Sequence, residues 1–138
     1  MTRPIMRNSI LLAVLLYAFT TFLSAQSLTT LYSFAGSDDG GYPVAGLVQG
    51  SDGNFYGTTV VGGANSDGTV FKITPSGTLT TLYSFAGSGG AFPYGGLVQG
   101  SDGNFYGTTY GGGAHDAGTV FRLGVVPPCA TCRPVSWR

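Results

Sequence analysis

One unit of about 50 residues is present twice in this chain. Two long segments recur without change: LTTLYSFAGS at 28–37 and 79–88, and GLVQGSDGNFYGTT at 46–59 and 96–109. The offset between the copies falls from 51 to 50 residues because SDDGGYP in the first unit is one residue longer than SGGAFP in the second. Such a period, with its length change in a loop, is typical of architectures that stack identical small sheets or arrange them in a ring.

Each unit contains four short segments that we expect to form strands. In the first unit they are Leu28–Phe34, Gly46–Gly50, Asn54–Val60 and Thr69–Thr74, separated by Gly, Pro, Asp and Ser. The Pro75-Ser76-Gly77 turn predicts antiparallel pairing of Thr69–Thr74 with the LTTLYSF segment that follows. The prediction is an all-β fold: two four-stranded antiparallel β-propeller-type blades, forming a partial propeller, after an N-terminal signal-peptide helix.

The first 25 residues have the three-part pattern of a secretory signal peptide. Arg3 and Arg7 precede a wholly apolar run at 10–19, and Ser24-Ala25 offers small residues for cleavage. The alternative is a retained membrane anchor, but the dense apolar part is shorter than the ~20 residues that span a bilayer. We therefore expect a secreted, extracellular or cell-surface protein with no membrane segment after cleavage. Its expected parts are a signal peptide (1–25), a first repeat (28–78), a second repeat (79–123) and an irregular tail containing Pro and Cys (124–138).

The charge balance argues against a nucleic acid partner. Six Lys and Arg residues balance six acidic residues, all of them Asp, and the formal net charge is zero. Binding to nucleic acid or anionic lipid requires a basic patch, which this composition does not provide. The chain is glycine-rich, with 24 glycines, but 13% of its residues are aromatic. These supply the apolar surface that disordered glycine-rich tracts lack.

The repeat unit GLVQGSDGNFYGTTVVGGANSDGTVFKITPSGTLTTLYSF resembles the tandem repeat of the GloVer-type choice-of-anchor proteins. The resemblance rests on DGNFYGTT, on GGAN with DGTVFKITP, and on LYSF, and it covers residues 28–123. It implies propeller-like repeats in an exported surface protein of unassigned activity, often with many more repeats and a C-terminal sorting anchor. This chain has only two repeats and ends in GVVPPCATCRPVSWR, without an apolar helix. The departure leaves open that it is a truncated form of a longer propeller protein.

Three oxygen-bearing side chains in the GGANSDG and GGAHDAG segments are candidate calcium ligands: Asn65, Asp67 and Asp116. The alternative is that they satisfy backbone donors in turns, because the spacing of an EF-hand loop is absent. The only histidine, His115, stands where the first unit has Asn65, so the repeat itself does not depend on a histidine. We predict no cofactor.

The tail carries the only cysteines, Cys129 and Cys132, in a CxxC arrangement. An oxidising compartment permits a disulfide between them, and a redox dithiol or half of a zinc site are the alternatives. No GxSxG or P-loop occurs, and no acid and base pair can be named as catalytic residues. Several tyrosines, among them Tyr94 and Tyr110, form stacking platforms for sugars or peptides if they face outward, whereas Phe55, Tyr56, Phe105 and Tyr106 are expected mainly in the core.

These patterns favour a secreted or cell-surface repeat protein that acts as a non-enzymatic binding or structural module for an unknown ligand. The alternatives are a truncated fragment of a longer propeller protein and a propeller-type enzyme, a lyase or glycosidase. Closed propellers use typically 4 to 8 blades, and repeat units are usually unstable below three. We therefore expect self-association that completes a ring, a truncated remnant, or a compact two-sheet sandwich, and a carbohydrate or a cell-surface protein as the external partner.

Overall fold

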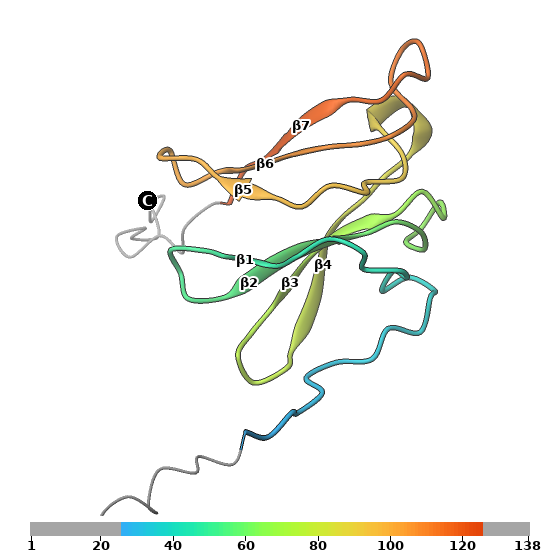
Figure 1. Ribbon diagram of the computed structural model, residues 1–138. Helices are drawn as coiled ribbons and strands as arrows, with labels where there is room; N and C mark the ends of the chain where they lie inside the picture. The colour runs from blue at the N-terminus through green and yellow to red at the C-terminus, as the bar shows by residue number, and fades with distance from the viewer. Residues whose placement is uncertain (1–25, 126–138) are drawn as a thin grey trace, which may run out of the picture.

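The computed structural model describes residues 26–125, which form two antiparallel β-sheets that face each other (Figure 1). The first sheet contains, in order, β1 (Val48–Gln49), β2 (Phe55–Thr59), β3 (Thr69–Ile73) and β4 (Leu79–Ser84). The second contains β5 (Val98–Gln99), β6 (Phe105–Thr108) and β7 (Val120–Leu123), and a short 3₁₀-helix, η1 (Gly87–Gly89), lies in the connection. No α-helix occurs within these residues, so the all-β prediction is confirmed, and they include no helix that could span a membrane.

The turns follow from the local sequence. In the first β1–β2 hairpin, Gly53 donates its N–H to the carbonyl of Gly50 over 2.9 Å and has a φ of 81°, which favours glycine. The Asp52 carboxylate accepts the N–H of Asn54 over 3.1 Å and closes the turn from its side chain. At the β3–β4 turn, Gly77 donates to Thr74 over 2.9 Å. The antiparallel pairing predicted across that turn is confirmed, with a bulge between Val70 and Phe71.

The boundary between repeats does not coincide with the boundary between sheets. β4 begins the second repeat in the sequence, yet it is hydrogen-bonded to β3 and forms the outer strand of the first sheet. The expectation of two four-stranded blades is therefore wrong for the second sheet, which has three strands. Residues 124–138 do not repeat the LTTLYSF segment.

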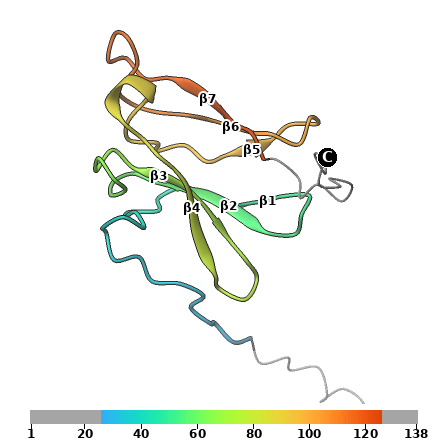
Figure 2. The ribbon, with the colours of Figure 1, turned by 180° about the vertical axis from the view of Figure 1, so that it is seen from behind.

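The first copy of that segment behaves differently from the second. Residues 28–34 were expected to form a strand, but they belong to no ladder. Their sequence is identical to that of residues 79–85, which contain β4. The difference has a physical cause: β4 has β3 beside it as a hydrogen-bonding partner, and within the described residues no strand is paired with residues 28–34. Figure 2 shows this segment on the side of the first sheet that is opposite β7, and Phe34 contacts Phe71 there.

The core lies mainly between the two sheets, and Phe71 and Ile73 are buried on the other face of the first sheet. The ring of Tyr56 from β2 stacks on the ring of Phe105 from β6, with centroids 4.0 Å apart and planes at 29°. Val70 and Phe85 are also buried there, and Phe85 contacts Phe121 edge-on at 5.1 Å. The prediction of Tyr56 and Phe105 as core residues is confirmed, whereas Phe55 and Tyr106 are half-buried. The predicted signal-peptide helix and the Cys129–Cys132 pair lie outside the described residues.

Candidate functional site

The aspartates of the repeats are used in turns. Five of them accept a hydrogen bond from a backbone N–H: Asp39 from Ala35, Asp52 from Asn54, Asp67 from Gly87, Asp102 from Asn104, and Asp116 from Gly112. These bonds are 2.8–3.1 Å long. A carboxylate held in this way satisfies an otherwise unpaired donor and fixes the loop around it. The acidic groups therefore serve the architecture of the turns.

The turn around Asp52 contains the most extensive of these arrangements. One carboxylate oxygen accepts the side-chain amide of Asn54 over 2.7 Å and the hydroxyl of Tyr56 over 2.8 Å. Burial raises the pKa of Asp52, but the hydrogen bonds from Asn54 and Tyr56 outweigh this effect, so its pKa is lowered overall. Burial raises the pKa of Tyr56 to about 12, and its hydrogen bond to the Asp52 carboxylate and the charge of that carboxylate act in the same direction.

The second repeat reproduces this turn with nearly the same geometry. Asp102 accepts the Asn104 amide over 2.7 Å and the Tyr106 hydroxyl over 2.7 Å. Hydrogen bonds from Tyr106 and then from Asn104 lower the pKa of Asp102. The arrangement recurs because the sequence recurs, and it holds its own hairpin in both copies. It is therefore a structural motif of the repeat.

A pair of threonines, which the sequence analysis did not single out, stabilises the far end of each sheet. In the first sheet the hydroxyls of Thr59 and Thr69 lie 2.7 Å apart, and Thr59 also donates to the carbonyl of Val61 over 3.1 Å. Gly40, with a φ of 97°, lies against this pair so closely that a Cβ there would collide with both side chains. The second sheet repeats the pair as Thr109 and Thr119, 2.9 Å apart. The signal for this pair was the ten-residue spacing of threonine in both repeats.

The candidate calcium ligands lie in turns that they themselves stabilise. Asn65 donates its amide to the carbonyl of Phe85 over 3.0 Å, and Asp67 accepts the N–H of Gly87 over 3.0 Å. Asp116 lies in the corresponding turn of the second repeat, where it accepts the N–H of Gly112 over 2.8 Å. His115 beside it is exposed. Over residues 26–125, no three His, Cys, Asp or Glu side chains are grouped closely enough to hold a metal ion.

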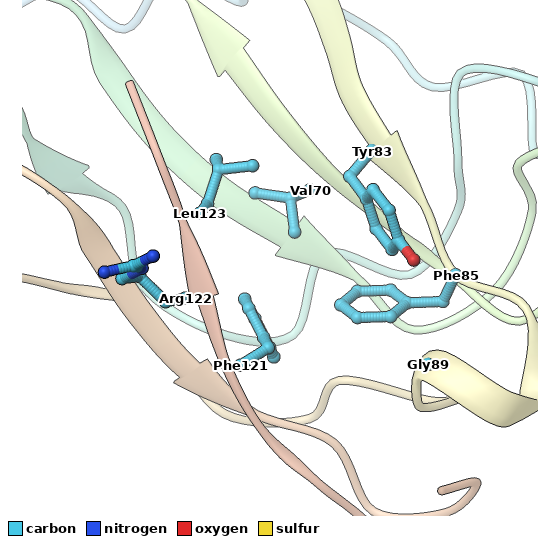
Figure 3. Close-up of a pocket in the computed structure, with 7 residues that line it drawn as sticks. All are labelled: Val70, Tyr83, Phe85, Gly89, Phe121, Arg122 and Leu123. Carbon is cyan, nitrogen blue, oxygen red and sulfur yellow. The ribbon is translucent and has the colours of Figure 1, made fainter. Parts of the chain in front are cut away.

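A small pocket opens between the two sheets (Figure 3). Its volume is about 180 Å³, below the 300–1,000 Å³ of usual small-molecule sites. Tyr83 lies in β4, and Phe85 follows that strand. Phe121 and Leu123 lie in β7, and Arg122 is at the edge of the pocket. The walls are mainly apolar. This pocket provides van der Waals contacts and has no pair of groups suited to acid–base chemistry.

Aromatic side chains also lie on the outside of the molecule. Tyr94 and Tyr110 are 55% and 76% exposed, and their rings meet edge-on with centroids 5.7 Å apart. Tyr42 is exposed as well and has a φ of 55°, a value uncommon for residues other than glycine. Its counterpart Phe92 has a φ of 56°. The sequence suggested outward-facing tyrosines as one of two possibilities, and the structure places these three outward.

The two sheets, the shared hairpins and the recurring turns define an all-β tandem-repeat protein. A family model of the Gloeobacter/Verrucomicrobia repeat matches residues 15–127, and the chain belongs to this family. The resemblance to GloVer-type repeats is thereby confirmed. No curated protein matches the chain.

Proposed function

We propose that this protein is an exported, non-enzymatic binding and structural module built from two propeller-type blades. The observation that carries the proposal is the use of the acidic side chains: five aspartates hold backbone N–H groups in turns and leave no pair poised for proton transfer. What the repeats offer to a partner is apolar and aromatic surface. Such surface serves binding.

Export is supported by the sequence of the first 25 residues, with two arginines, an apolar run and small residues before the expected cleavage point. Outside the cell, the expected partners are a carbohydrate or a cell-surface protein. A test of export is to express the complete chain in a bacterial host and to sequence the N-terminus of the protein recovered from the medium. A mature N-terminus between residues 25 and 28 is expected, and an intact N-terminus in the membrane fraction would show a retained anchor.

We assign the binding of the external partner to the side chain of Tyr94. Its ring is more than half exposed and is supported edge-on by Tyr110. The corresponding residue of the first repeat is Val44, which is also exposed. Aromatic rings give sugars and peptides a rigid apolar surface, and an aromatic contact contributes about 0.5–1.5 kcal/mol beyond area burial.

The test measures retention of the protein on insoluble polysaccharides, with cellulose, chitin and peptidoglycan as the probes. We expect co-sedimentation with at least one of them. Tyr94→Ala should weaken it about two- to tenfold, following the size of an aromatic contact. Val44→Ala is the matched control and should leave retention unchanged. Absence of retention on every polymer, or equal losses in the two variants, would contradict this assignment.

A further inference from the structure

The two sheets present the same two faces but do not use them equally. We call the face with Tyr56, Thr58 and Val70 in the first sheet, and with Tyr106, Thr108 and Val120 in the second, the tyrosine face. The opposite face, with Phe55, Phe71 and Ile73 in the first sheet and Phe105, Phe121 and Leu123 in the second, is the phenylalanine face. The core forms where the tyrosine face of the first sheet packs on the phenylalanine face of the second. The tyrosine face of the second sheet is left uncovered. The phenylalanine face of the first sheet is covered only by residues of its own unit, which bury Phe71 and Ile73 but leave Pro43 and Leu47 exposed.

The uncovered tyrosine face consists of residues whose counterparts are buried. Val120 is 81% exposed, whereas Val70 is 1% exposed. Tyr110, just after β6, is 76% exposed, and Val60 at the same place in the first repeat is 5% exposed. Thr108 is exposed, while Thr58 is buried and donates its hydroxyl to the carbonyl of Gly95 over 3.1 Å. The second sheet thus lacks the neighbour that covers the first.

The phenylalanine face of the first sheet shows a similar relation only at its margin, because its central residues Phe71 and Ile73 are 3% and 6% exposed. Pro93 is fully buried, whereas Pro43 is exposed. Phe105 is buried, whereas Phe55 is half-buried. A groove of about 280 Å³ lies between this face of the first sheet and residues 31–34, and Leu31, Leu47 and Phe71 are among its lining residues. The corresponding surface of the second sheet is the one that packs against the first sheet.

The strand edges are also complementary. β7 has no partner on its outer side within the described residues, where β3 has β4. Residues 28–33 repeat the sequence of β4 and belong to no ladder. Moved by the repeat offset, the observed β3–β4 register pairs Val120 with Tyr32, Phe121 with Thr30, and Arg122 with Thr29. Unpaired edges of matching sequence are templates for strand addition.

Residues 32–34 are already placed as this pairing requires. Tyr32 meets Phe34 edge-on at 5.2 Å, and Phe34 meets Phe71 at 5.1 Å. The same contacts recur in the second repeat, where Tyr83 meets Phe85 at 5.2 Å and Phe85 meets Phe121 at 5.1 Å. Phe34 therefore has the same position at the first sheet as Phe85 has at the second. Residues 28–33, which precede Phe34, are the counterpart of β4 and extend toward the place that a preceding sheet would occupy.

We propose that copies of this chain associate head to tail. Residues 28–33 of one copy pair antiparallel with β7 of the next. The tyrosine face of the second sheet in one copy packs on the phenylalanine face of the first sheet in the other, as the internal sheets do. The interface is heterologous, because different surfaces meet, and it closes into a ring when the rotation per copy permits. Rings of two, three or four copies correspond to the 4 to 8 blades of closed propellers. This inference is independent of export, but it shares Tyr110 with the proposed carbohydrate site at Tyr94.

Three positions distinguish the new interface from the internal one. His115 stands in place of Asn65, so an imidazole replaces the amide that donates to the carbonyl of Phe85. Tyr110 stands where Val60 is buried, so the docked copy has to accommodate a larger side chain. Ala117 stands in place of Asp67, so the bond from Asp67 to the N–H of Gly87 has no equivalent. The hydrogen bond from the Thr58 hydroxyl to the carbonyl of Gly95 has an equivalent between copies. Thr108 of one copy is the corresponding donor, and the backbone carbonyl of Ala45 of the other is the corresponding acceptor.

The first test is the molar mass in solution of protein expressed from the complete gene, measured by light scattering over a hundredfold range of concentration. A discrete mass of two, three or four chains is expected. A single-chain mass at every concentration, or a broad distribution of masses, would overturn the proposal.

A charge on the uncovered face separates assembly from folding. Val120→Lys should reduce the mass to that of one chain without changing the β-sheet circular dichroism, because Val120 is exposed in the single chain and buried only between copies. Ala114→Lys is the matched control, since both Ala114 and its counterpart Ala64 are exposed. Retention of the assembled mass by Val120→Lys, or equal loss in both variants, would contradict the interface.

Cysteine cross-linking tests the register. In a background with Cys129→Ser and Cys132→Ser, the pair Thr29→Cys and Arg122→Cys should form disulfides between chains, because the equivalent residues Thr80 and Lys72 are direct partners. Thr30→Cys with Arg122→Cys is the control, because a shift of one residue turns the side chain to the other face. A ladder of linked chains from the first pair alone is expected. Equal linkage in both pairs, or none in the first, would overturn the register.

Discussion

The two halves of this molecule differ far more in environment than in sequence. Val70 and Val120 occupy the same place in identical GTVF segments, yet the first is buried and the second is among the most exposed apolar residues described. Pro93 and Pro43 show the opposite difference. Burial at these positions is therefore a property of the neighbouring sheet. On the other face of the first sheet, Phe71 and Ile73 are buried by segments of their own unit.

Substitutions at equivalent positions measure this difference directly. Each substitution is made in the Val120→Lys background, where the tyrosine face of the second sheet stays uncovered whether or not copies of the native chain associate. Each pair changes the same residue type in the same local sequence, so the contribution of local propensity is shared between the two variants. The difference in unfolding free energy between the two variants of a pair then measures the contribution of the neighbouring sheet.

The largest effect is expected for Phe105→Ala, which removes a fully buried ring from its stack on Tyr56. Loss of such a ring costs about 3–5 kcal/mol of the free energy of unfolding, from lost burial and the cavity left behind. Phe55→Ala should cost clearly less, because Phe55 is half-buried. Urea unfolding followed by circular dichroism checks the pair, and equal losses would refute the asymmetry.

The second effect concerns stability at alkaline pH. Because folding raises the pKa of Tyr56 to about 12, above the ordinary value of about 10, the contribution of this phenol is fully present below pH ~10. It is lost as the pH rises through the folded value, since the folded state disfavours the phenolate. Tyr56→Phe should flatten the pH dependence of the unfolding free energy over this range. Tyr106→Phe should flatten it less, because Tyr106 is less buried; an equal flattening would contradict the comparison.

A third pair tests a polar contact between the sheets. Thr58→Val removes the buried hydrogen bond to the carbonyl of Gly95 and should cost about 1 kcal/mol. Thr108→Val changes an exposed hydroxyl and should be close to neutral. Thermal unfolding of the two proteins gives the difference. A larger loss for Thr108→Val would reverse the assignment of covered and uncovered faces.

The smallest effect is expected at the rim of the interface. Gln99 accepts the N–H of Ser51 over 3.0 Å and thereby links the two sheets at the surface. Gln99→Ala should cost about 0.5 kcal/mol, at the low end for a hydrogen bond, because water replaces the lost partner. Gln49→Ala should cost less in the same unfolding measurement. Indistinguishable values would show that the link adds nothing to stability.

The sequence was sufficient for features that depend on a few neighbouring residues. The hairpin at Asp52 and the turn at Gly77 were predictable because the residues that form each turn lie within five positions of one another. The pairing of β3 with β4 followed from that turn. The all-β class followed from the alternation of short apolar segments with glycine-rich turns.

Features that depend on distant partners were not predictable. Residues 28–34 and 79–85 have one sequence and two structures, because only the second copy has a strand beside it. Asp67 and Asn65 appeared as candidate metal ligands, but their bonds reach Gly87 and Phe85, twenty residues further along the chain. Composition and spacing cannot locate such a partner when both copies of the repeat offer the same residues.

The crossing of β4 from the second repeat into the first sheet has a consequence for how such proteins lengthen or shorten. A gene that gains or loses a whole 50-residue unit by recombination at the sequence boundary still encodes a protein in which each sheet that is followed by another unit takes its last strand from that unit. Adjacent modules therefore remain fastened by backbone hydrogen bonds after each such event. The number of units can change during evolution without new contacts having to arise between neighbouring units.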